Sequence, residues 1–240
     1  PPTLPNFGLA DGIAASYGTF ATMFALYYRD VQGGKGQFID LSIYEPIFQL
    51  LGPQPMAYDQ LGIIQERMGN RSLNNAPRNT YQTLDKHWVA ISTNSPSIVK
   101  RVLTLCGGED VANDPRFQTP AGRVEFIDEV DGVVANWISQ HNLNEVLEKF
   151  EEVEAAVGPV YNIAQIFEDP QYIARNDIIN LNDEDLGKIK MTAGFPFMSE
   201  TPAEIRHAGP SKGKHNEEIY CKELKLGVED LDLLKEKGVI

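Results

Sequence analysis

The sequence predicts a mixed fold of the α/β or α+β class. Segments whose apolar residues recur every three to four positions alternate along the 240 residues with short segments of strand-like alternation. Turn signals rich in Gly, Pro and Asn separate these segments. The length falls between one and two average domains and is sufficient for a substantial core.

The first predicted element is a long helix over residues 12–28. Its apolar residues have helical spacing, and small alanines fill the remaining faces. Because a helix that is apolar nearly all round is typical of a protein interior, we expect this helix to be buried. Asp11 directly precedes it, so this carboxylate is either the N-cap of the helix or a group held at the helix N-terminus for chemistry. From the residues alone, the N-cap interpretation is favoured.

A glycine-rich turn at 32–36 follows, and then a predicted strand over 37–43 and a helix from 44 to 51. The turn lacks the spacing of a phosphate-binding loop and lies between a helix and a strand, the reverse of that motif. Glu45 either faces the same pocket as Asp11 or caps its own helix. Residues 59–80 are polar and irregular, which indicates an ordered loop or linker whose basic residues, Arg71 among them, are expected to be solvated.

The remaining elements follow the same logic. A β-hairpin is predicted over 81–92, because two short apolar runs flank a turn at 84–86. Ser95-Pro96 is typical of a helix start, and Gly107-Gly108 is expected to end that helix. Further predictions are amphipathic helices at 128–139 and 144–154, a short strand at 158–161, helices at 163–168 and near 173, a hairpin turn at 183–187, and helices at 215–224 and 229–237.

Composition and charge exclude several classes of function. There are 34 acidic and 21 basic residues, giving a formal net charge of -13, so a nucleic acid is not an expected partner. No apolar run is long enough to span a membrane, and no membrane partner is expected. The four histidines and two cysteines lack metal-ligand spacing, so no metal is expected, both cysteines are interpreted as structural, and a cytoplasmic location is predicted.

Six stretches, taken in order along the chain, resemble family III CoA-transferases, the CaiB/BaiF family. The resemblance covers essentially all 240 residues. Any one stretch alone is weak, but six in the same order make a specific match. The stretches are "GLADGIAASYGTFATMFALYYRD", "GGKGQFIDLSIYEPIF", "RMGNRSLNNAPRNTYQTLDKHWVAIS", "NDPRFQTPAGRVEFIDEVD", "VGPVYNIAQIFEDPQYIAR" and "LGVEDLDLLKEKGVI".

The resemblance implies a catalytic role for Asp11. In this family an aspartate ahead of a small-residue helix attacks an acyl-CoA thioester, and an aspartyl-CoA thioester then passes CoA to a carboxylic acid. Coenzyme A is therefore expected as part of the acyl-CoA substrate, with a carboxylate acceptor as the second partner. The loop over the aspartate corresponds to the stretch that contains Asn70, Arg71, Asn74 and Asn75, which are candidate substrate-binding residues.

The resemblance also implies the domain organisation. Residues 1–58 are expected to belong to a Rossmann-like large domain, 59–72 to a linker, 73–188 to a small α+β domain, and 189–240 to a segment that returns to the large domain. Family members form interlocked homodimers. The chain begins with Pro-Pro and no methionine, which suggests a fragment that lacks an upstream half and is expected to be inactive alone.

Two departures leave alternatives open. Formyl-CoA transferases have a glycine run where this chain has the asparagine-rich 70–77 stretch, which puts an oxalate-type acceptor in doubt. The related α-methylacyl-CoA racemases use an Asp with a His contributed from upstream, and an acyl-CoA racemase or isomerase is the first alternative. The second is a non-catalytic subunit that needs a partner chain carrying the nucleotide-binding half.

Overall fold

A computed structural model of the protein describes residues 2–240, which form two compact units. The first unit comprises Pro1–Asn79 and Pro115–Asp131, and the second comprises Thr80–Asp114 and Gly132–Ile240. The elements are a mixture of helices and two small sheets. The α/β class predicted from the sequence is thereby confirmed.

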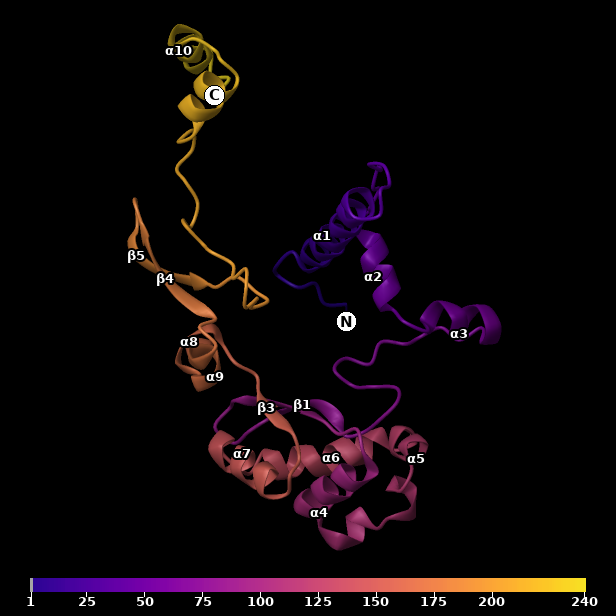
Figure 1. Cartoon of the computed structure of the whole chain (residues 1–240). Helices are drawn as coiled ribbons and strands as arrows, with labels where there is room; N and C mark the ends of the chain where they lie inside the picture. Colours follow the sequence, from indigo (N-terminus) through magenta and orange to yellow (C-terminus); the bar gives the residue numbers. More distant parts are fainter. Residues whose placement is uncertain (1) are drawn as a thin grey trace. The chain divides into compact units, whose positions relative to one another are not determined.

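Three helices open the first unit: α1 (Leu9–Asp30), α2 (Tyr44–Leu50) and α3 (Gln54–Leu61) (Figure 1). α1 packs against α2. The prediction that α1 is buried is wrong for this chain, because Ala14 is its one buried residue. Aromatic side chains along α1 are solvent-exposed, with Phe24 at 69%. The apolar repeat was identified correctly, but within this chain α2 contacts only part of the helix surface.

The chain after α1 turns but does not form the predicted strand. Gly34 N–H donates to the Tyr28 carbonyl at 3.0 Å, and a Cβ placed at Gly34 would lie 2.2 Å from the Tyr28 ring, so only glycine fits against that ring. Residues 35–42 are extended but are assigned to no sheet. Alternation alone predicted a strand at 37–43, and it fails here because a strand also needs a hydrogen-bonded neighbour.

The rest of the first unit is a short helical segment. A 3₁₀ turn, η1 (Pro115–Phe117), precedes α5 (Pro120–Glu125), which leads into α6 (Ile127–Ile138). Thr119 caps α5 by accepting from the Gly122 N–H at 3.0 Å. A Cβ at Gly122 would lie 2.2 Å from the Arg116 carbonyl oxygen, so glycine allows η1 to approach α5 closely.

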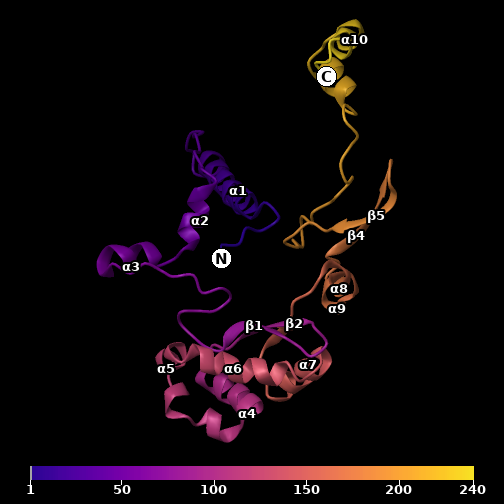
Figure 2. The same ribbon diagram turned by 180° about the vertical axis from the view of Figure 1, so that it is seen from behind.

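The second unit is built on a three-stranded sheet of order β1-β2-β3, with β1 at Arg78–Gln82, β2 at Trp88–Ser92 and β3 at Val157–Pro159 (Figure 2). β2 and β3 pair antiparallel, with Ala90 opposite Gly158. Residues of β2 alternate between exposed and buried along the strand. One face of the sheet is therefore covered and the other is open.

Helices α4 (Pro96–Ala112), α6 and α7 (Leu143–Glu152) cover that face. The core contains residues of every one of these elements: Tyr81, Val89, Ile91, Val102, Val134, Ile138, Val146 and Phe150, with Ala155 beside them. Ser95 caps α4 as predicted, accepting from the Ile98 N–H. The helix is interrupted at Gly108, whose φ of 81° is non-helical, as predicted for Gly107-Gly108, and a second helical stretch then runs up to Ala112.

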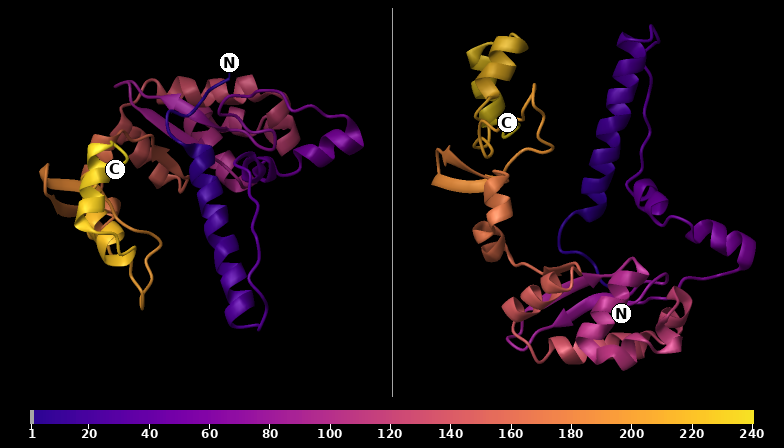
Figure 3. Two further views of the ribbon diagram at one scale, coloured as in Figure 1. Left: turned by 90° about the horizontal axis from the view of Figure 1, so that it is seen from above. Right: turned by 60° about the horizontal axis from the view of Figure 1, so that its bottom comes forward.

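The C-terminal part of the second unit contains α8 (Ile163–Glu168), α9 (Pro170–Ala174), a hairpin of β4 (Ile178–Asp183) and β5 (Gly187–Thr192), a π-helix η2 (Glu217–Glu223) and α10 (Val228–Glu236). β4 and β5 form a two-stranded ribbon of their own (Figure 3). Each of these elements lies where the sequence predicts it, with boundaries shifted by a few residues.

Replacement of Phe150 by alanine is expected to lower the free energy of unfolding of the second unit by about 3–5 kcal/mol, because it opens a cavity in the fully buried core. Both tryptophans of the chain, Trp88 and Trp137, belong to this unit, so urea titration followed by tryptophan fluorescence reports on it. Leu186→Ala is the control, since Leu186 is 75% exposed and should change the value by less than about 0.5 kcal/mol. Equal effects of the two substitutions would contradict this core assignment.

Candidate functional site

Asp11 lies in the first turn of α1, but it is not the N-cap. The helix begins at Leu9 with Gly8 at the cap position, so Asp11 is the third helical residue. A carboxylate in the first turn of a 22-residue helix is stabilised by the positive end of the helix dipole. The side chain is exposed in this chain, so the sheltered pocket expected around it is not formed by the described residues.

Glu45 accepts a hydrogen bond from the Ser42 N–H at 2.7 Å. It therefore satisfies a backbone donor at the start of α2. Glu45 was predicted either to face the same pocket as Asp11 or to cap its own helix, and this hydrogen bond corresponds to the capping role.

The candidate substrate residues Asn70, Arg71, Asn74 and Asn75 lie in the irregular segment between α3 and β1. We refer to residues 70–77 as the 70–77 loop. Arg71 was expected to be solvated, but its guanidinium contacts two carboxylates of α6: Nη2 lies 2.8 Å from Asp128 Oδ1, and Nε lies 2.7 Å from Asp131 Oδ2. Burial acts to lower the pKa of the Arg71 guanidinium, but the hydrogen bonds and charges of the two carboxylates together outweigh it and raise the pKa.

Arg123 of α5 also contacts this loop, although no pattern in the sequence singled it out. Its side chain is 2% exposed. Nε donates to the Ala76 carbonyl at 2.7 Å, Nη2 donates to Asn75 Oδ1 at 3.0 Å, and Nη1 donates to the Phe117 carbonyl at 2.9 Å. Burial lowers the pKa of this guanidinium. An arginine between Gly122 and Val124 gave no signal in the sequence, because its partners are backbone carbonyls whose positions only the fold defines.

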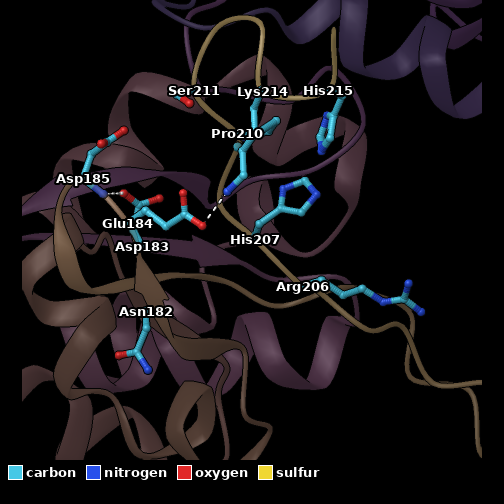
Figure 4. Close-up of a pocket in the computed structure, with 11 residues that line it drawn as sticks. Asn182, Asp183, Glu184, Asp185, Arg206, His207, Pro210, Ser211, Lys214 and His215 are labelled. Atoms are coloured by element: carbon cyan, nitrogen blue, oxygen red, sulfur yellow. Dashed lines mark hydrogen bonds and ion pairs between the residues drawn. The ribbon is translucent and has the colours of Figure 1, made fainter. Parts of the chain in front are cut away.

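The second unit contains further cavities, and two of them are formed by its C-terminal elements. One, of about 540 Å³, is lined mainly by apolar side chains of α8, α9 and the β4–β5 hairpin, including Phe167 and Ile178. The other, of about 130 Å³, is polar and lies between the β4–β5 turn and residues 206–215 (Figure 4). In the polar cavity Lys214 forms an ion pair with Glu184. Asp11 lines neither of them.

Over residues 2–240, no cluster of three or more His, Cys, Asp or Glu side chains has the arrangement needed to hold a metal ion. None of the helices described for this chain combines the length and apolar character that a membrane crossing requires.

Comparison with known proteins identifies the family of this chain. Residues 1–216 match the model of CoA-transferase family III. The chain is 35% identical over 240 residues to the succinyl-CoA–D-citramalate CoA-transferase of Chloroflexus aurantiacus, and covers 60% of that protein. It is 32% identical over 242 residues to the beta subunit of the succinyl-CoA–L-malate CoA-transferase of the same organism, again covering 60%.

The fold agrees with a solved structure from the same family. A CaiB/BaiF family protein from Brucella suis superposes with a TM-score of 0.73 at 25% identity, over 92% of this chain and 57% of that protein. The fold and the sequence thus define a transferase-family protein with the family III CoA-transferase fold, as predicted. The chain belongs to CoA-transferase family III and spans about 60% of the length of the relatives it matches.

Cys106 is expected to be chemically inert in the folded protein. Burial raises the pKa of its thiol to about 12, so only about one thiol in ten thousand is ionised at pH 8. Iodoacetamide treatment at pH 8 followed by peptide mass spectrometry should therefore leave Cys106 unmodified until the protein is unfolded in urea. Rapid modification of Cys106 in the folded protein would contradict its structural role.

Proposed function

We propose that the protein is a CoA-transferase that moves CoA from an acyl-CoA thioester to a carboxylic acid, with Asp11 as the covalent nucleophile. The observation that carries the proposal is the family match over residues 1–216, which includes Asp11 in the first turn of α1. Curated relatives named as CoA-transferases support the reaction type.

The proposed chemistry uses Asp11 twice. Its carboxylate attacks the thioester carbonyl and expels CoA thiolate, forming a mixed anhydride; the thiolate then attacks the aspartyl carbonyl, releasing the donor acid and leaving an aspartyl-CoA thioester. The acceptor carboxylate attacks this thioester to form a second mixed anhydride and free the thiolate. The thiolate finally attacks the acceptor's carbonyl, which gives the new acyl-CoA and restores Asp11.

The N-terminus of α1 supports this role electrostatically. Each step passes through an oxyanion next to the Asp11 side chain, and the positive end of a helix dipole stabilises negative charge within the first turn. The exposure of Asp11 in this chain leaves the carboxylate accessible to a thioester.

We propose succinyl-CoA as the donor to test first, with small hydroxy acids that carry two carboxylates as acceptors. The relatives named above act on succinyl-CoA together with D-citramalate or L-malate. The 70–77 loop lacks the glycine run of formyl-CoA transferases, which favours an acceptor other than oxalate. Asn70, Arg71, Asn74 and Asn75 are the proposed loop residues near the acceptor.

We further propose a cytoplasmic homodimer, in which the exposed apolar face of α1 is covered by the rest of the assembly. Exposed Phe20, Met23, Phe24 and Tyr27 make α1 an unfavourable surface in water. The proposed domains are 1–58 and 189–240 in the large domain, with the linker 59–72 leading to a small domain at 73–188. The two cysteines are free, in keeping with a reducing compartment.

Asp11→Asn is expected to lower the transferase kcat of the intact protein at least about a thousandfold, because an amide cannot act as the nucleophile. Hydroxylamine or borohydride treatment in the presence of acyl-CoA should modify Asp11 in the wild type, as detected by peptide mass spectrometry. Asp30→Asn is the matched control at the opposite end of α1, where Asp30 pairs with Arg29 on the surface and activity should be unchanged.

Two results would refute the assignment. One is trapping of a residue other than Asp11. The other is solvent deuterium exchange at the α-carbon of the acyl-CoA in the absence of any acceptor acid, which would indicate a racemase.

A further inference from the structure

A residue near the start of the 70–77 loop and a residue of β1 just past its end bind the same oxygen atom. Arg71 Nε donates to Asp131 Oδ2 at 2.7 Å, and Asn79 Nδ2 donates to the same oxygen at 2.9 Å. Asp131 is 5% exposed, so its charge is compensated by these protein donors more than by water. Fixing both ends at one point removes most of the freedom that a loop of this length has in solution.

A second anchor fixes the C-terminal part of the loop, at Asn75 and Ala76. Arg123 donates hydrogen bonds to the Ala76 carbonyl and to the Asn75 side chain. Its third hydrogen bond, to the Phe117 carbonyl, connects it to η1. Ala76 is fully buried and Arg123 nearly so. A buried guanidinium is stable only when its N–H donors have hydrogen-bond partners. Lysine carries a single ammonium group and cannot reproduce the planar arrangement of the guanidinium donors.

The contacts of Arg71 also decide whether this residue can bind the carboxylate of an acceptor acid. Arg71 is the only basic residue of the 70–77 loop, and two carboxylates already compensate its charge. It is therefore poorly suited to receive the carboxylate of an acceptor acid. The loop also carries the amide side chains of Asn70, Asn74 and Asn75, whose N–H groups are donors of the kind that bind anions. The positions of these side chains depend on the two anchors.

We propose that Asp131 and Arg123 are positioning residues that hold the 70–77 loop as a fixed wall of the acceptor site, and not as a lid that opens and closes. This inference rests on the proposed transferase function for its kinetic consequence, while the anchoring itself rests on the contacts alone. Asp131 and Arg123 do not touch the reacting atoms. They act through the backbone of the loop.

Hydrogen–deuterium exchange of the intact protein tests the anchoring without any substrate. In Arg123→Lys, the backbone amides of residues 70–76 should exchange at least about tenfold faster than in the wild type, because the bidentate geometry of the guanidinium is lost. Arg101→Lys is the matched control: Arg101 also donates to two backbone carbonyls, those of Val153 and Glu154, but in the second unit. In the wild type, saturating acceptor acid should leave the exchange of this loop unchanged, as expected for a wall.

Steady-state kinetics tests the consequence for the reaction. Arg123→Lys and Asp131→Asn should raise the KM for the acceptor acid at least about tenfold, while the rate of forming the aspartyl-CoA intermediate from the donor stays within about twofold. Arg101→Lys should change neither value. A general loss of stability would lower both steps together, so this split separates positioning from a structural effect.

Asn75→Ala keeps the Asp131 anchor and the hydrogen bond from Arg123 to the Ala76 carbonyl but removes the Asn75 acceptor of Arg123, so it gives a milder variant if Arg123→Lys does not fold. It should accelerate exchange in the same residues by a smaller factor. Unchanged exchange in both variants, strong protection of the wild-type loop by the acceptor, or an unchanged acceptor KM overturns the inference. Failure of the proposed function is recognised separately, as a wild-type protein without transferase activity whose loop exchange still responds to Arg123→Lys.

Discussion

The one-sided burial of the sheet β1-β2-β3 is the constraint on which the second unit depends. β2 alternates between buried and exposed residues, so only one face can be covered, and α4, α6 and α7 supply the side chains that cover it. Burial of Phe150, Val134 and Ile91 in one cluster gives this unit a core of its own. Since α6 also carries Asp128 and Asp131 at its start, the helix that completes this core also carries the carboxylates that hold the 70–77 loop.

The first unit is organised by polar contacts to a larger extent. α1 has only Ala14 buried, and its aromatic residues face solvent. By contrast, the segment around the 70–77 loop has Arg123 and Asp131 buried with hydrogen-bonding partners. A buried charge is tolerated only when it is paired and bonded, so such a network specifies one conformation more strictly than an apolar contact does.

The proposed reaction needs an accessible nucleophile and an acceptor acid held in one orientation. A carboxylate at the start of α1 is accessible, and the loop proposed to meet the acceptor is held by charged residues outside the reaction itself. In the proposed mechanism the acceptor acid must approach the aspartyl-CoA thioester in a single orientation. A pre-organised wall contributes to that orientation without any cost of ordering the loop during the reaction.

The sequence by itself determined the class of the fold, the family and most of the helices. Local signals such as Ser95-Pro96 or the amphipathic pattern of 144–154 depend on nearest neighbours along the chain, which the sequence contains in full. The sequence also placed Asp11 at the start of the long helix, and its catalytic role stays a prediction.

Only the tertiary structure decided what surrounds these elements. Residues 37–43 alternate as a strand does but find no neighbouring strand, and α1 has the composition of a buried helix but is largely exposed. Arg71 and Asp131 are 60 residues apart in sequence, and Arg123 and Ala76 are 47 apart, yet the fold brings each pair into hydrogen-bonding contact. Periodicity records which face of an element is apolar, whereas burial and ion pairing depend on which other segment reaches that face, and that is a property of the folded chain alone.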